Sequence, residues 1–187
     1  MRFTALLVAG MATIASCIPA QQVADNIGQI TTLSRDLQTP AKSLNILDGA
    51  LLTLGQGNFP ESLSTHDFTT GGFTEIVSVG TAFADGMDPE TYDEDESAII
   101  FDAFRTFVKV HQELLNILIG KAGLFSTVPF IGQPVASVLR AVEGVVDTLA
   151  LSLIDMAESA AQDLQEEADA LGSTLDTAIG TYSGLSL

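Results

Sequence analysis

Apolar residues recur every three or four positions through most of this 187-residue sequence, which is the spacing of one face of an α-helix. The first such stripe starts after Gln22 and is crossed by Pro40, with Thr39 placed to cap a new helix there. We therefore expect one kinked helix, or two helices in line, ending at Gly55. The stripe consists of Val23, Ile27, Ile30, Leu33, Leu37, Leu44, Leu47, Leu51 and Leu54.

The stretch from His66 to Phe83 is harder to assign, because it combines β-branched residues with glycine. Its apolar residues, among them Phe73 and Ile76, fit one helical face tolerably, which favours a helix. A β-strand over Phe73–Val79 remains the alternative for this part of the chain.

A long helix with a wide apolar face is predicted over Ser97–Ile119, with its N-cap at its first residue or at Asp95. An uncharged run, Ala122–Leu139, follows it and contains Pro129 and Pro134. Proline stops a helix from running through such a segment, so the run is not predicted to span a membrane.

Two further helices are predicted in the rest of the chain. Pro134 suits the first turn of a valine- and leucine-rich helix that extends to Ile154. Asp155, with Glu158 three residues later, resembles a capping box and predicts the start of the last helix. The sum is four to five amphipathic helices, which predicts an all-α helical bundle.

The first 20 residues, MRFTALLVAGMATIASCIPA, have the order of a secretory signal peptide, with Arg2 before an apolar stretch and small residues at its end. We expect cleavage after Ala20, with Cys17 as a second choice, and a single domain over residues 21–187. Cleavage removes the only cysteine, so the mature chain would be secreted, to the extracellular space or the cell wall, without a disulfide.

Charge excludes several classes of partner. Without Arg2 the mature chain has 6 basic residues against 24 acidic ones, a net charge of −18. This balance argues against binding nucleic acid and against docking on an anionic lipid surface. The mean hydropathy of +0.35 is nevertheless high for so acidic a chain. Much apolar surface must therefore be buried in a core, by a ligand or by a partner.

No catalytic or metal-binding pattern stands out. His111, in KVHQELL, lacks the second histidine of a zinc helix, so we expect its side chain to be solvated or interfacial. The sequence has no G-x-S-x-G, no P-loop and no dinucleotide-binding glycines, and DGMDPETYDEDE lacks the spacing of an EF-hand. We expect no enzymatic activity, no metal and no cofactor.

The helix around residues 99–108 is apolar on nearly every side, as in a central helix or one that meets a ligand or a surface. A filled bundle core and an apolar-ligand cavity between helices both explain this pattern. In the cavity hypothesis, Lys109, His111 or Arg140 meets a ligand carboxylate at the rim. The predicted ligand-binding residues are Phe101, Phe104, Phe107, Val108, Leu114, Phe125, Phe130, Val138, Val142, Val145 and Leu149.

Three segments carry a resemblance: IGQITTLSRDL, FDAFRTFVKVHQELLNILIGKAGLFSTVPFIGQPVASVLRAVEGVVDTLALSLI and EEADALGSTLDTAIGTYS. Together they resemble the fungal hydrophobic surface-binding protein A family, also called cell wall galactomannoproteins. The match is best from about Phe101 to Ser183 and weaker from Val23 to Leu54. It implies a secreted, non-enzymatic helical bundle that associates with the cell wall and adheres to hydrophobic surfaces. In some members the bundle holds fatty acids, and members that coat surfaces help to recruit secreted hydrolases.

The chain departs from that family in two respects. FPESLSTHDFTTGGFTEIVSVG is not the usual alanine-rich second helix, and a Ser/Thr-rich tail that carries mannose is missing. Two functions stand as hypotheses. The first is a binder of hydrophobic surfaces or of apolar ligands such as fatty acids. The second is a wall or surface-coat protein with a filled core that adheres through an exposed apolar patch.

Overall fold

The computed structural model describes residues 18–44, 72–87, 91–126 and 132–185. These residues are overwhelmingly helical and include no strand, which confirms the all-α class. The helices are α1 (Ala20–Ser43), α3 (Phe73–Asp85), α4 (Glu94–Lys121), α5 (Gly132–Met156) and α6 (Ala161–Ser183), with 3₁₀ turns at Ala122–Phe125 and Glu158–Ala160.

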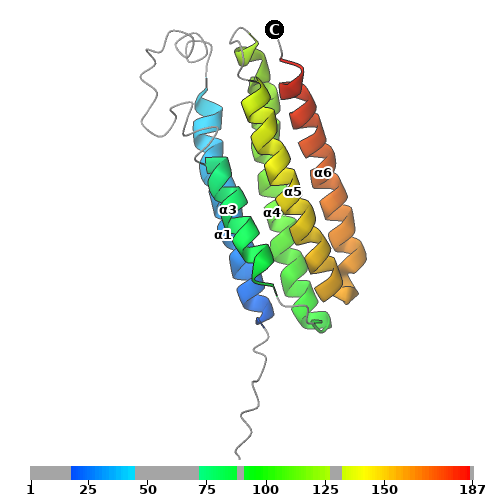
Figure 1. The fold of residues 1–187 in the computed structure, drawn as a ribbon. Helices are drawn as coiled ribbons and strands as arrows, with labels where there is room; N and C mark the ends of the chain where they lie inside the picture. The colour runs from blue at the N-terminus through cyan, green and yellow to red at the C-terminus, as the bar shows by residue number, and fades with distance from the viewer. Residues whose placement is uncertain (1–17, 45–71, 88–90, 127–131, 186–187) are drawn as a thin grey trace, which may run out of the picture.

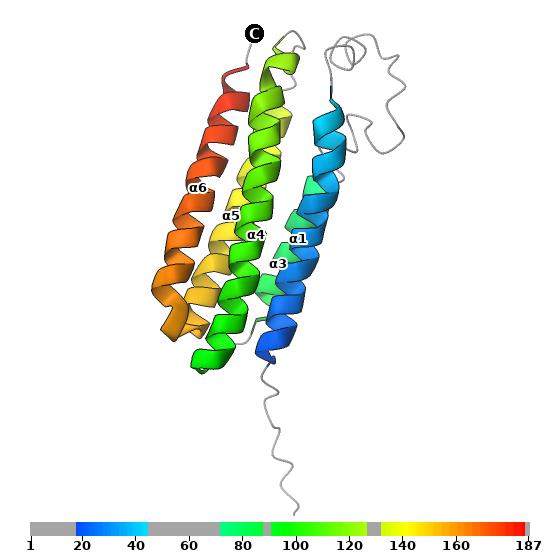
Figure 2. The same cartoon turned by 180° about the vertical axis from the view of Figure 1, so that it is seen from behind.

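The helices lie along one common axis, with α1, α4 and α6 running one way and α3 and α5 the other (Figure 1). Figure 1 shows α3 in front of α1 and α5 in front of α4, and the view from behind in Figure 2 reverses this order. Neighbouring helices pack in a ring: α1 on α4, α4 on α6, α6 on α5, α5 on α3, and α3 on α1. The last of these contacts is the least extensive.

The first helix continues through Pro40 to Ser43. The predicted new helix start with Thr39 as its cap is therefore wrong. Gln38 and Ala41, on either side of the proline, are both buried, so packing of this face against α4 holds the helix together where the proline lacks a donor. The rest of the predicted stripe, Leu47 to Leu54, lies outside the described residues.

Residues just before α1 also belong to the fold. The hydroxyl of Tyr92 donates to the carbonyl of Ile18 at 2.6 Å, and the backbone N–H of the same tyrosine donates to the carbonyl of Met156 at 2.8 Å. Ala20 is buried. These contacts tie the start of α1 to the approach to α4 and to the end of α5.

The segment Phe73–Asp85 is a helix, which settles the choice against a strand there. Its glycine lies where three helices meet. A Cβ atom on Gly80 would come within 2.5 Å of Val145 Cγ1 on α5 and 3.7 Å of Ile30 Cδ1 on α1. The glycine thus lets α3 lie directly on α5, which outweighs its low helix propensity.

The start of α4 differs from the prediction by a few residues. Its N-cap is Asp93, whose side chain accepts from the N–H of Glu96 at 2.9 Å, while the carboxylate of Glu96 accepts from the N–H of Asp93 at 3.3 Å. This is a capping box. Asp95 lies inside the helix and Ser97 is buried, so neither is the cap. Consecutive acidic residues, Asp93 to Glu96, are similar candidates for the cap in the sequence, and the packing of the segment before α4 determines which of them is used.

The predicted capping box of Asp155 and Glu158 is also wrong. The helix α5 runs past Asp155 to Met156, and α6 begins at Ala161 without a side-chain cap. Met156 and Ala157 are buried at the junction between α5 and α6, so packing rather than capping determines where α5 ends. Across the described ranges, no helix has the length and apolarity that a membrane crossing requires.

Candidate functional site

The inward faces of the ring form one continuous apolar core. On α4 the buried residues step by three or four positions from Ile100 through Phe104, Phe107 and Leu114. On α5 a stripe that includes Val142 does the same. The interior between the helices is therefore the part of the molecule best suited to an apolar ligand.

Most of the predicted ligand-binding residues gather in this core. The structure buries Phe104, Phe107, Val108, Leu114, Phe125, Val142 and Leu149. Phe101, Val138 and Val145 are half-buried and pack against its edge. Phe130 lies outside the described residues. Residues from α4, the following 3₁₀ turn and α5 thus belong to one core, as both the filled-core and the cavity hypotheses require.

One side of the apolar helix around residues 99–108 faces outward. Ile99 is 41% exposed. The guanidinium of Arg105 lies 5.2 Å from the centre of the Phe101 ring and covers it. Arg105 in turn donates to Asp102 at 2.9 Å. On this side, Arg105 therefore covers the part of Phe101 that the core leaves open, and Ile99 remains exposed.

A polar cluster interrupts the apolar interior where α1 meets α4. It consists of Thr31, Ser34, Gln38 and His111, all buried. His111 is 0% exposed, so the expectation of a solvated or interfacial side chain is wrong. Its Nδ1 lies 2.8 Å from the hydroxyl of Ser34. The helical period places His111 on the inward face of α4 with Phe107 and Leu114, but its polar residue type favoured a solvated interpretation.

The ring of His111 is neutral at physiological pH. Burial lowers its pKa to about 4, because the charged ring would lose its contact with water. Its Nε2 has no hydrogen-bond partner among the described residues. The ring also packs on Phe107, with 5.3 Å between the two centroids. The histidine thus has one buried polar atom without a partner, Nε2.

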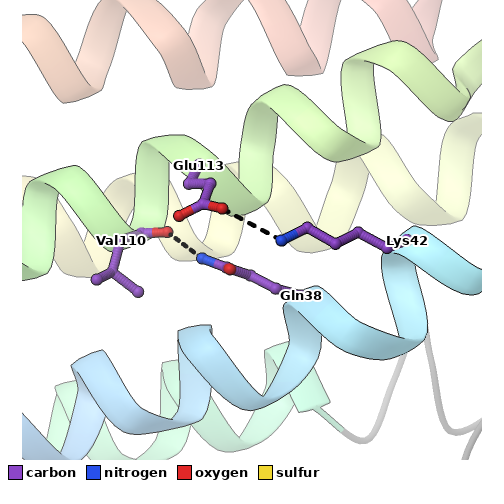
Figure 3. A network of polar contacts seen from close by, with 4 residues as sticks. All are labelled: Gln38, Lys42, Val110 and Glu113. Atoms are coloured by element: carbon purple, nitrogen blue, oxygen red, sulfur yellow. Dashed lines mark hydrogen bonds and ion pairs between the residues drawn. The ribbon is translucent and has the colours of Figure 1, made fainter.

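Further polar contacts, partly buried or at the surface, hold α1 to α4 (Figure 3). Gln38 donates to the carbonyl of Val110 at 3.1 Å, and Lys42 pairs with Glu113 at 3.2 Å. Lys121 donates to backbone carbonyls at the C-terminal end of α1. This side of the ring is therefore closed by both apolar and polar contacts.

The three side chains expected at the rim of a pocket take different places. Lys109 is exposed, and Arg140 donates to the hydroxyl of Ser183 at 2.9 Å on the surface. His111 lies inside the bundle and not at a rim. The structure does not bring the three together around one ligand carboxylate.

Among the described residues, surface grooves lie between neighbouring helices at α5 and α6 and at α1 and α3. One, of about 510 Å³, lies between α5 and α6 and carries Asp147, Asp169 and Asp176. The other, of about 630 Å³, follows the loosely packed seam between α1 and α3. Its lining consists of Ala24, Asp25, Gly28, Gln29, Thr32, Leu33, Glu75 and Val79. Within the described residues, the ring is packed least extensively at this seam.

Comparison with known proteins yields a likeness of fold. No protein-family model matches the sequence, and no curated protein matches it. Among solved structures, the crystal structure of AfMp4p in complex with palmitic acid is similar, with a TM-score of 0.70. The two chains are 16% identical, and the match covers 87% of this chain and 99% of that one. The same bundle architecture is therefore present in a protein that was crystallised with a fatty acid.

Proposed function

We propose that this protein binds a fatty acid or a similar lipid chain in the interior of its helical ring. The observation that carries the proposal is the apolar interior enclosed by the ring, in a fold shared with a protein solved with palmitic acid. Each buried CH₂ group contributes about 0.8 kcal/mol, so even partial burial of a long chain gives substantial affinity.

The seam between α1 and α3 provides the route by which a lipid chain enters. It is the least extensive contact of the ring, and a groove of about 630 Å³ follows it. Gly28 faces open space in this groove, with nothing within 4 Å of a Cβ atom placed there. Separation of α3 from α1 breaks fewer contacts than separation of any other neighbouring pair in the described ring.

Val142→Phe tests whether the interior admits a lipid. Val142 is buried on α5, so the larger side chain occupies the space in which an acyl chain would lie. We expect the variant to fold and to lose at least tenfold in affinity for palmitic acid, which corresponds to about 1.4 kcal/mol. The measurement is displacement of a fluorescent fatty acid, with native mass spectrometry of the wild type for bound lipid.

Ala141→Phe is the matched control, since Ala141 lies one position earlier on the same helix and is exposed. Its affinity should equal that of the wild type. The proposed function fails if wild-type protein neither retains lipid nor competes for the fluorescent probe. A filled interior without room for ligand would instead appear as a destabilised Val142→Phe variant, by about 1–3 kcal/mol.

We also propose that the protein acts outside the cell, without catalysis, as a member of the hydrophobic surface-binding protein A family. The signal-peptide pattern and the three resembling segments support this. Association with the cell wall, adhesion to hydrophobic surfaces and recruitment of secreted hydrolases belong to the same proposal. The coat-protein alternative has less support, because Ile99 and Leu151 are the large apolar side chains exposed in the described part of the chain.

The structure favours the second of the two expected cleavage sites. Ile18 accepts the hydrogen bond of Tyr92, and Ala20 is buried, so cutting after Ala20 would remove parts of the fold. We propose cleavage after Cys17. The intact mass of the secreted chain should correspond to a first residue of Ile18, and a chain that begins at Gln21 would refute this.

A further inference from the structure

The two ring nitrogens of His111 differ, because Nδ1 is hydrogen-bonded and Nε2 is buried without a partner. His111 occupies the centre of the inward stripe of α4, between Phe107 and Leu114. In a histidine ring, Nδ1 is bonded to Cγ, the ring atom that is attached to Cβ, whereas Nε2 lies on the side of the ring away from Cβ. Nδ1 faces Ser34 on α1, whereas Nε2 is buried and has no hydrogen-bond partner among the described residues.

The hydrogen bonds of Ser34 decide which ring nitrogen carries the proton. The hydroxyl of Ser34 donates to the carbonyl of Ile30 at 3.0 Å. A hydroxyl has one proton, so toward His111, 2.8 Å away, its oxygen acts as an acceptor. On the basis of the contact between Ser34 and the Ile30 carbonyl, we assign the proton of the neutral ring to Nδ1, which leaves a lone pair on Nε2. The unpartnered atom is an acceptor and needs a donor.

A buried acceptor without a donor costs about 1–3 kcal/mol. The part of the chain that the structure describes includes every lysine and arginine after Arg2, and each of them is exposed or half-buried. An ionised carboxylate in this interior would therefore meet no cation, and its burial would be strongly unfavourable. The group that fits beside Nε2 is an uncharged O–H.

We propose that Nε2 of His111 accepts a hydrogen bond from the O–H group of the bound lipid, which is a protonated carboxyl or an alcohol. The inference rests on the proposed function and adds the chemistry of the head group to it. The head group then lies inside the bundle, beside Ser34 and Phe107, and the chain extends along α4 toward Phe104 and Ile100. From His111 to Ile100 the helix provides about 16 Å of apolar wall.

Three probes of equal chain length test the proposal: palmitic acid, 1-hexadecanol and methyl palmitate. The ester has no O–H donor and leaves Nε2 unpaired. We expect wild-type mature protein to bind at least one of the two donors at least tenfold more tightly than the ester. Tighter binding of the acid than of the alcohol identifies free fatty acids as the ligand class, and the reverse identifies hydroxylated lipids.

Substitution of the histidine separates a hydrogen bond from simple packing. His111→Phe keeps a flat ring against Phe107 but removes the acceptor, so the preference for donor over ester should shrink to less than about threefold. His111→Gln, which retains an acceptor, should keep part of that preference. Equal affinities for all three probes in the wild type, or a preference unchanged in His111→Phe, would overturn the inference. If none of the probes binds to the wild type, the proposed function itself fails, and the inference with it.

A measurement on unmodified His111 covers the case in which His111→Phe does not fold. The chain has two histidines, and His66→Gln leaves a single imidazole to observe by ¹⁵N NMR. The Nε2 signal should move when 1-hexadecanol is added and stay in place with methyl palmitate. Identical responses to both probes show that Nε2 meets no ligand donor, for instance because it holds an internal water instead.

Discussion

Replacing Phe104 with alanine is expected to lower the free energy of unfolding by about 3–5 kcal/mol. The side chain is 1% exposed, at the centre of the inward face of α4, and its ring lies 6.0 Å from that of Phe107. Truncation removes the buried apolar surface of the ring and leaves a cavity that rigid helices fill only in part. Urea unfolding of the mature chain, followed by the helical circular dichroism signal, measures the loss.

Phe101→Ala is the matched control, because it makes the same truncation three residues earlier on the same helix. Phe101 is half-buried and covered by Arg105, so its loss should cost about 1 kcal/mol. Comparable losses at the two positions would show that Phe104 is not a core residue. That result would also contradict the apolar inner face of α4 on which the proposed lipid site depends.

Acidification from pH 6.5 to pH 4 is expected to remove about 3 kcal/mol of stability through His111 alone. Burial lowers the pKa of this residue from 6.5 to about 4 in the folded protein. The unfolded chain therefore takes up the proton first as the pH falls. The stability that the neutral ring contributes is fully present above pH 6.5, declines between pH 6.5 and pH 4, and is lost below pH 4.

His111→Phe isolates this effect from the many carboxyl groups of the chain. Among them, Glu143 has its pKa raised by burial and by the nearby Asp176 and Asp147, and it contributes with the opposite sign. Such groups are shared by wild type and variant, so they cancel in the difference between the two unfolding free energies. Denaturation at pH 7, 5.5 and 4 measures that difference. Between pH 7 and pH 4, the wild type should lose about 3 kcal/mol more unfolding free energy than His111→Phe. A difference that does not change with pH would contradict the buried, neutral histidine.

Local pattern in the sequence determined the class of the fold and much of its interior. Spacing of three and four predicted the inward positions of Phe104, Phe107 and Leu114, because the helical period relates each residue to the next turn without reference to any other helix. The same pattern favoured a helix over Phe73–Asp85. The signal peptide stays a prediction from the sequence.

Tertiary structure decided what those positions face. Periodicity shows which side of a helix is apolar, but not which helix lies opposite, so the ring order and the weak seam between α1 and α3 had no signal in the sequence. Tertiary packing also placed His111 in the core against Ser34, 77 residues away, and left Phe101 half-buried under Arg105. A residue's environment is set by the partners that packing brings to it, and those partners are distant in the chain.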